Sequence, residues 1–191
     1  MTDYLAPHRA FLGELFTGAP PADPVAALNL AAARARARAY VVLPLGLQPA
    51  TEARELASLH AAIALQSVRH GRPLAPTLIL SGGPVLRDGA AAGAADFLLA
   101  LALSLDENAA IHAFASGPAP VPASAAAKPA DSNTAFLLGP DTVRRAHALG
   151  LQPGAHLVAG EARAFFAALG DGHSAAPAPD QVLRAVFISV D

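Results

Sequence analysis

The residues best suited to chemistry stand directly after a predicted buried strand. They are Ser81, Gly82 and Gly83, where small side chains leave the backbone N–H groups accessible. Such groups can cradle a phosphate or a carboxylate. Arg87 and Asp96 are the nearest charged side chains that could complete an anion site. A second interpretation stays open, in which the glycines only provide the backbone freedom that a tight turn at a strand end needs.

No other catalytic or metal-binding pattern is present in the sequence. It lacks a Gly-Lys-Ser/Thr phosphate loop, a Gly-x-Gly-x-x-Gly fingerprint and a Gly-x-Ser-x-Gly turn. The seven histidines show neither His-x-x-x-His nor His-Glu-x-x-His spacing, and cysteine is absent, so we expect no metal and no cofactor. We interpret His60 as a side chain satisfied by its surroundings, and Asp141 as a carboxylate that stabilises a helix N-terminus.

The composition restricts the class of protein. The 191 residues are 53% hydrophobic and 15% charged, which is enough apolar material for a packed core and excludes a disordered chain. A net charge of −2 without a basic tract argues against nucleic acid as a partner. The apolar run 95–105 is too short to cross a bilayer, which takes about 20 residues. The lack of cysteine and of a signal pattern fits a cytoplasmic protein.

Helix and strand patterns alternate along the chain. Asp23 followed by Pro24 is a typical helix start, with an N-cap side chain and a proline at the first helical position. Thr51 is expected to cap a second helix, whose first turns Glu52 and Glu55 favour. The expected helices cover residues 24–39, 52–70, 91–105, 140–150 and 161–169, and the expected strands cover 40–45, 77–81, 111–115 and 184–190.

This alternation predicts an α/β fold. Residues 24–191 are expected to form a single layered domain in which helices flank a central, mostly parallel or mixed sheet. Residues 1–23 are expected to form an N-terminal lead-in arm with one short helix. Residues 117–133, which are mostly alanine, proline, serine and glycine, are expected to form a low-complexity loop.

Four stretches of the chain follow the order of segments in a known family. They are residues 31–43 with 52–55, Leu78–Gly83, Phe97–Leu103, and a last stretch from Pro140 through Phe165 and Phe166 to Leu183–Ala185. Over residues 27–189 the chain resembles the C-terminal (MOFRL) domain, with its preceding linker, of the bacterial glycerate kinase/hydroxypyruvate reductase family. The resemblance implies an α/β fold and, in the family, phosphorylation of glycerate-like hydroxy acids with ATP.

The polar loops of that family are where this sequence departs from it. The family motif Ser-Gly-Gly-Glu ends in Pro84 here, and the Arg-Asn-Gln-Glu before the leucine-rich helix reads Gly93-Ala94-Ala95-Asp96. The aspartate-rich loop of the family falls on residues 116–122, which contain no carboxylate. The family's late Thr-Asn-Val-Asn-Asp stretch falls on residues 178–182, in a shortened loop.

These replacements predict a degenerate, stand-alone relative that acts as a non-catalytic binding or assembly module, because phosphoryl transfer needs a carboxylate-held metal and cations on the phosphates. The alternative is a residual enzyme of the family that acts on a small hydroxy acid, with a partner chain supplying the larger N-terminal domain. A third interpretation is a sensor of a small anionic metabolite at Ser81–Gly83. Because the family's interdomain surface would be exposed, we expect it to be covered by a homo-oligomer or by residues 1–23.

Overall fold

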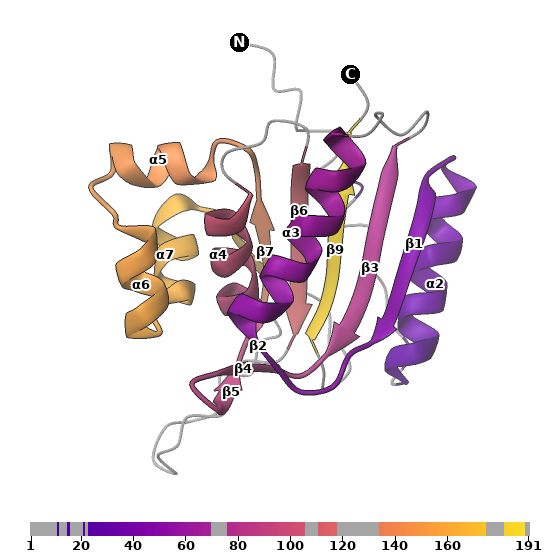
Figure 1. Ribbon diagram of the computed structural model, residues 1–191, viewed down its shortest axis with the longest axis horizontal. Helices are drawn as coiled ribbons and strands as arrows, with labels where there is room; N and C mark the ends of the chain where they lie inside the picture. Colours follow the sequence, from indigo (N-terminus) through magenta and orange to yellow (C-terminus); the bar gives the residue numbers. More distant parts are fainter. Residues whose placement is uncertain are drawn as a thin grey trace.

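The computed structural model describes residues 23–69, 76–105, 111–117, 134–174 and 182–189, together with Phe11, Leu15 and Pro21. This part of the chain is built around a six-stranded sheet that carries helices on both faces (Figure 1). The α/β layered fold expected from the sequence is therefore confirmed.

The central sheet is mixed. Its strand order is β1-β3-β9-β6-β7-β8. The strands are β1 (Val41–Leu47), β3 (Thr77–Gly83), β6 (Ile111–Gly117), β7 (Thr134–Leu138), β8 (Gly172–Ser174) and β9 (Val182–Ile188). Only β1 and β3 are parallel neighbours, and the other four pairs are antiparallel. Of the two expected sheet types the mixed one is found, because β9 lies between β3 and β6 and runs antiparallel to both.

The helices form a layer on each face of the sheet. They are α2 (Pro24–Ala37), α3 (Ala53–Arg69), α4 (Ala94–Ser104), α5 (Thr142–Ala148), α6 (Pro153–Ala159) and α7 (Ala162–Leu169). In Figure 1, α3 and α4 cross in front of the sheet, α5–α7 lie beside α4 on the left, and α2 lies beside β1 on the right. None of these helices is both long and apolar enough to span a bilayer.

Two apolar clusters hold the layers together. The larger one lies between the sheet and α3, α4 and α7, where Phe97, Phe165 and Phe166 are completely buried. The smaller one lies between the sheet and α2, and it includes Phe11 and Leu15 from the N-terminal segment. The ring of Phe11 stacks on Tyr40 with 4.5 Å between centroids. Phe11 and Leu15 of the predicted lead-in arm therefore pack on the α2 side of the sheet.

A second, three-stranded sheet was not expected. It contains β2 (Thr51–Glu52), β4 (Val85–Arg87) and β5 (Ala90–Ala92), in the order β2-β4-β5. The expected helix cap at Thr51 is wrong, since Thr51 belongs to β2 and α3 begins at Ala53. Strands of two or three residues leave no alternating pattern long enough to recognise, and alanine is uncommon in strands.

Several other boundaries also differ from the expectation. Strand β3 continues through Gly82 and Gly83 instead of ending before them. Strand β7 and helix α6 were not assigned from the sequence, because both are short apolar segments without a clear period. The predicted loop lies outside the described residues apart from Gly117, which ends β6. That loop, and the predicted course of most of residues 1–23, stay predictions.

Candidate functional site

Ser81 lies at the centre of a buried polar cluster. It stands directly opposite Arg184 on the neighbouring strand β9, so both side chains point to the face covered by α3 and α4. The Ser81 hydroxyl lies 2.8 Å from His60 Nε2 of α3, and it accepts a hydrogen bond from Arg184 Nε at 2.9 Å. All three side chains have 0% exposure. We call His60, Ser81 and Arg184 the buried centre.

The protonation state of His60 follows from its neighbours. Its Nδ1 lies 2.7 Å from the carbonyl oxygen of Leu56, which can only accept, so Nδ1 carries the hydrogen. Nε2 of the neutral ring then accepts from the Ser81 hydroxyl. Burial and, to a smaller extent, the nearby Arg184 lower the pKa of His60 to about 4, against the opposing effect of the Leu56 hydrogen bond. The imidazole is therefore neutral at neutral pH.

Arg184 is a buried cation that has no carboxylate partner among the residues that the structure describes. Its Nη1 donates to the carbonyl oxygen of Gly83 at 3.1 Å, and its guanidinium lies over the ring of Phe97, 5.4 Å from the centroid. Its Nη2 has no hydrogen-bond partner within the described part of the chain. Burial lowers the pKa of Arg184 to about 10, which still leaves the side chain charged at neutral pH. This arrangement ties β9 to the end of β3 and to α4.

The contact between Ser81 and His60 has the geometry of a nucleophile beside a base, because the imidazole is oriented by a second hydrogen bond. A substrate, however, would have to reach Ser81 through the packed layer formed by α3 and α4, since neither side chain has any exposed surface. The geometry therefore assigns the buried centre a structural role. It joins α3, β3 and β9 in one fixed arrangement, which agrees with the interpretation of His60 as a satisfied side chain.

Gly82 and Gly83 are needed for the close approach of neighbouring groups. A Cβ at Gly82 would lie 2.9 Å from Leu47 Cδ2, and a Cβ at Gly83 would lie 2.3 Å from the carbonyl oxygen of Gln48. Gly83 also has a φ of +126°, a backbone conformation that residues other than glycine rarely adopt. The backbone here is paired with β9, and Gln48 N donates to the Gly82 carbonyl at 2.8 Å. These contacts account for both glycines without a ligand.

The structure brings together the two charged residues of the expected anion site. Arg87 Nη1 of β4 and Asp96 Oδ1 of α4 form an ion pair. The other carboxylate oxygen of Asp96 accepts from Gly93 N at 3.0 Å and so caps the start of α4. The Arg87 guanidinium also packs against Gly160, where a Cβ would lie 2.6 Å from its Cζ. Ser81 contacts neither residue of this pair through a hydrogen bond.

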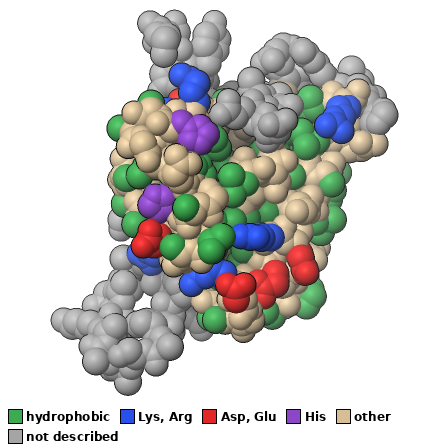
Figure 2. Space-filling view, turned by 60° about the vertical axis from the view of Figure 1, so that its left-hand side comes forward, with side chains coloured by type: hydrophobic (Ala, Val, Ile, Leu, Met, Phe, Trp, Pro, Cys, Tyr) green, Lys and Arg blue, Asp and Glu red, His purple; other side chains and the backbone are tan. Residues whose placement is uncertain are grey.

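A surface hollow of about 450 Å³ lies where α3 begins, beside the β4–β5 turn and α6. Its lining residues are Glu52, Ala53, Arg54, Glu55, Arg87, Asp88, Gly89, Leu157 and Val158. Glu52 is held in place by two hydrogen bonds, which its carboxylate accepts from Asp88 N at 3.0 Å and from Gly89 N at 2.8 Å. We call this feature the acidic hollow, and Figure 2 shows acidic side chains gathered at the lower edge of this side of the molecule.

The acidic hollow could not be predicted from the sequence, because its walls come from three segments that are far apart in the chain. From the sequence, Glu52 and Glu55 are expected to favour a helix start, and residues 52–55 belong to a stretch that carries the family resemblance, but neither expectation predicts a surface hollow. In the part of the chain that the structure describes, no three histidine, cysteine, aspartate or glutamate side chains are placed to hold a metal ion.

Comparison with known proteins shows which proteins are similar to this chain in sequence and in fold. No protein-family model matches the chain. A putative hydroxypyruvate reductase from Agrobacterium vitis is 33% identical over 176 residues, which cover 87% of this chain and 39% of that protein. A glycerate kinase from Thermotoga maritima shares the fold with a TM-score of 0.70 and 18% identity, over 86% of this chain and 40% of that one. The chain belongs to the glycerate kinase/hydroxypyruvate reductase family.

The chain corresponds to only part of its relatives in the glycerate kinase/hydroxypyruvate reductase family. It spans about 40% of the length of both proteins just described. The crystal structure of the PH0495 protein from Pyrococcus horikoshii also shares the fold, with a TM-score of 0.67 and 14% identity over 87% of this chain and 38% of that one. That the matched part is the C-terminal (MOFRL) domain of the family stays a prediction.

Two of the described positions at which this sequence departs from the motifs that the family resemblance implies lie at one edge of the central sheet. Strands β3 and β6 both run antiparallel to β9, so their carboxyl ends lie at the same edge. Pro84 follows β3, Gly117 ends β6, and Asp96 lies in the first turn of α4. Pro84 and Gly117 therefore lie at the same edge of the sheet, where the family resemblance predicts polar residues.

Proposed function

We propose that this domain is a non-catalytic binding or assembly module that keeps the α/β scaffold of the glycerate kinase/hydroxypyruvate reductase family. The observation that carries the proposal is the engagement of the polar side chains around β3 with one another. Ser81 is enclosed by His60 and Arg184, and Arg87 is paired with Asp96. Groups that position a phosphate or a hydroxy acid must instead be available to the ligand.

The residues at the neighbouring loop ends support the same proposal. Phosphoryl transfer depends on cations and a carboxylate-bound metal that stabilise charge on the transferred group. The family resemblance expects such polar residues at the edge where β3 and β6 end, whereas this chain has Pro84 after β3 and Ala94 and Ala95 before Asp96. Proline and alanine side chains supply neither charge nor hydrogen bonds to a substrate.

An activity assay tests the proposal. The purified 191-residue chain is supplied with glycerate and ATP, and separately with hydroxypyruvate and a reduced nicotinamide cofactor, which are the reactions that the names of its relatives suggest. We expect no product above the level of a reaction without protein. Turnover that disappears in a folded Asp96→Asn variant would contradict the proposal, since a contaminating enzyme does not respond to a substitution in this chain.

The alternative function is a residual enzyme that works with the remainder of the family's architecture supplied by a partner chain. The observation that favours it is the coverage of only about 40% of the relatives' length. The same two assays are repeated with extract of the source cells and increasing amounts of the chain. Product formation that rises with the added chain favours the enzyme, and product formation that is independent of it favours the module.

Binding of a small anionic metabolite at Ser81, Gly82, Gly83, Arg87 and Asp96 remains a separate proposal. Thermal unfolding with and without glycerate or inorganic phosphate tests it, because a ligand of the native state raises the melting temperature. A rise that is lost in Arg87→Gln supports the site, and unchanged melting temperatures contradict it. Gly82→Val is a poor control, since its Cβ would lie 2.9 Å from Leu47 Cδ2.

We also propose that the protein forms a homo-oligomer in the cytoplasm. The cytoplasmic location rests on the lack of cysteine in the sequence, which fits a reducing compartment. Fractionation of the source cells tests it, and recovery in an exported fraction would contradict it.

A further inference from the structure

The first turn of α4 contains buried backbone donors without acceptors. The N–H groups of Ala94, Ala95 and Asp96 have no carbonyl partner inside the helix, because no turn precedes them. The N-cap residue is Gly93, which has no side chain that could accept from them, and they form no hydrogen bond with any residue that the structure describes. All three residues are at most 3% exposed. Backbone N–H groups that are removed from water in this way normally have a partner.

Arg184 brings a cation to the same place. The β4–β5 hairpin pairs Val85 with Ala92, so the base of the hairpin brings the end of β3 next to the start of α4 (Figure 1). At this base, Arg184 Nη1 donates to the carbonyl oxygen of Gly83, and the guanidinium lies 5.4 Å from the centre of the Phe97 ring at the start of α4. The Nη2 group of Arg184 is buried and has no acceptor within the described residues.

The positive charge at this place is not balanced by a hydrogen-bonded carboxylate of the described residues. Asp96 lies in the first turn of α4, but its two oxygens already accept from Arg87 Nη1 at 2.5 Å and from Gly93 N at 3.0 Å. Arg87 therefore neutralises Asp96, while the charge of Arg184 and the positive end of the α4 dipole remain. A charge that is removed from water is costly unless an opposite charge accompanies it. The surroundings of Arg184 Nη2 therefore favour an anion.

We propose that Arg184 and the N-terminus of α4 bind a small inorganic oxyanion of the phosphate type. The inference rests on the proposed binding function and deepens it by naming the class of ligand and the cation that holds it. An oxyanion has several acceptor oxygens, so one ion can accept from Arg184 Nη2 and from the N–H groups of Ala94 and Ala95. The site differs from the anion site proposed above, in which the cation is Arg87.

The burial of these donors limits the size of the ion and the way it binds. Ala95, Phe97 and Arg184 have no exposed surface, so a small ion suits the site better than an organic anion. We expect the ion to be enclosed as the chain folds, and to exchange with solvent only when the β4–β5 hairpin moves. Refolding in the presence of the ion is therefore the appropriate way to load the site.

The first test measures the melting temperature of the full chain after refolding from urea. Refolding takes place in a buffer without phosphate or sulfate, and in the same buffer with inorganic phosphate, with sodium chloride added to equalise the ionic strength. A dissociation constant of about 1 mM predicts a rise of about 5 °C at about 20 mM phosphate, because a ligand of the native state stabilises it. A melting temperature that phosphate leaves unchanged overturns the proposal.

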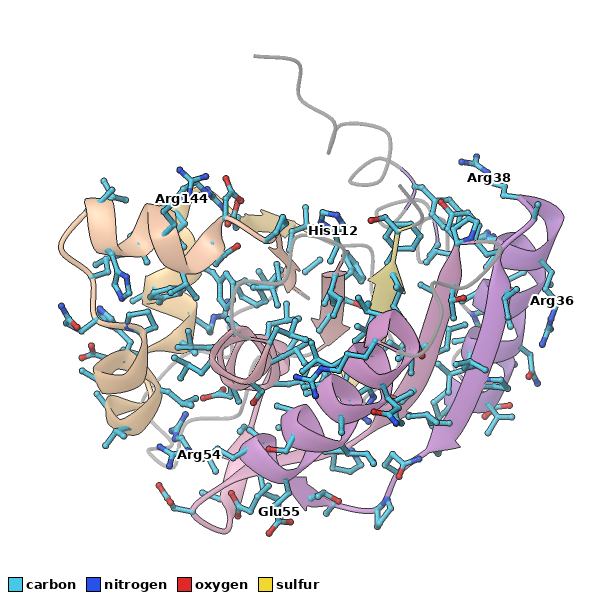
Figure 3. The ribbon with its side chains drawn as sticks, turned by 45° about the horizontal axis from the view of Figure 1, so that its top comes forward. Arg36, Arg38, Arg54, Glu55, His112 and Arg144 are labelled. Carbon is cyan, nitrogen blue, oxygen red and sulfur yellow. The ribbon has the colours of Figure 1, made fainter. Side chains whose placement is uncertain are left out.

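The decisive variant is Arg184→Met, which removes the cation and fills most of its space. The matched control is Arg144→Met, which removes one positive charge from an exposed position on α5. Figure 3 shows Arg144 at the top of the molecule, whereas Arg54 and Glu55 at the start of α3 lie at the bottom, beside the hairpin. We expect the rise to disappear in Arg184→Met and to persist in Arg144→Met, with circular dichroism confirming that both are folded. A rise that persists in Arg184→Met, or one that is lost equally in both variants, overturns the proposal.

Phosphorus NMR gives a second measurement that does not depend on stability. We expect the wild-type chain to broaden or displace the signal of inorganic phosphate, and a signal that is unaffected by the protein overturns the proposal. Ala94→Pro provides a second variant, because proline is well tolerated at the first helical position and Gly93 already has the extended backbone that precedes a proline. It removes one of the N–H donors, so we expect a weaker effect on the signal. An unchanged effect would overturn the role of the α4 N-terminus.

Arg87→Gln separates this site from the anion site proposed above. A response to phosphate that survives Arg184→Met and is lost in Arg87→Gln would assign the anion to the earlier site and overturn the present inference. None of these outcomes bears on the activity assays, so the proposed function and the anion site at Arg184 fail separately.

Discussion

The buried centre and the acidic hollow both contain polar or charged side chains, but in opposite surroundings. In the buried centre, His60, Ser81 and Arg184 are removed from water, and their hydrogen bonds run between three secondary-structure elements. In the hollow, Glu52 bonds to a single turn, and neighbouring charges remain in contact with solvent. Hydrogen bonds are stronger where the dielectric constant is low, and breaking them there costs more free energy. The comparison indicates that the centre maintains the fold, while the hollow is available for contacts with other molecules.

The largest effect is expected at Arg184. Replacement by alanine leaves a cavity and removes the donors of Ser81 and Gly83, so we expect the free energy of unfolding to fall by about 4 kcal/mol. Replacement by methionine fills most of the space and removes a buried charge without a carboxylate partner, so we expect a loss of about 1 kcal/mol or less. Urea unfolding measures both. An equal loss in the two variants would show that the guanidinium contacts, more than the occupied volume, stabilise the centre.

The second-largest loss in the free energy of unfolding is expected in acid, where the buried centre is weakened. The native pKa of His60, about 4, lies below its ordinary value of 6.5, so the unfolded chain binds this proton first as the pH falls. The corresponding stability is complete above pH 6.5 and is lost as the pH falls toward 4, with a total of about 3 kcal/mol. Urea unfolding at pH 7, 5.5 and 4.5 measures it. The variant His60→Gln should lack this contribution, and an unchanged slope in the variant would assign the effect to other groups.

The third effect on the free energy of unfolding is expected at the glycines beside the buried centre. Alanine at Gly83 brings a Cβ against the Gln48 carbonyl at a φ of +126°, so we expect Gly83→Ala to lower the free energy of unfolding by about 3 kcal/mol. Gly154→Ala is the matched control, because Gly154 lies in helix α6 with open space around its Cβ position. There we expect a gain of about 0.5–1 kcal/mol. A harmless Gly83→Ala would mean that the ends of β1 and β3 can separate at little cost.

The sequence predicted the scaffold better than the site. The helix start at Asp23 and Pro24 is confirmed, since the carboxylate accepts from Val25 N and Ala26 N. The sequence also predicted β3 and α4, because segments that are buried along their whole length consist mostly of apolar residues. The expected cap at Thr51 was wrong, because the local pattern could not reveal that Thr51 pairs with Val85, which is far away in the sequence.

The buried centre could not be predicted for the same reason. Ser81 and Arg184 are 103 residues apart, and only the strand register places them opposite each other. An arginine in an otherwise apolar strand was the available signal, since such a side chain is rarely buried without partners. Arg87 and Asp96 could be paired from the sequence because nine residues separate them, a distance that a short hairpin spans.

The smallest effect is expected at Glu52. This residue tests the contrast between the two regions most directly, because its hydrogen bonds belong to the hollow alone. Glu52→Gln replaces a carboxylate that accepts from Asp88 N and Gly89 N, so we expect the free energy of unfolding to fall by about 0.5–1 kcal/mol. Glu55→Gln, a neighbour without such bonds, should change it by less than about 0.5 kcal/mol. Urea unfolding of both variants measures the difference. A loss at Glu52 as large as that at Arg184 would mean that the turn beside the hollow is as essential to the fold as the buried centre, which would remove the contrast between the two regions.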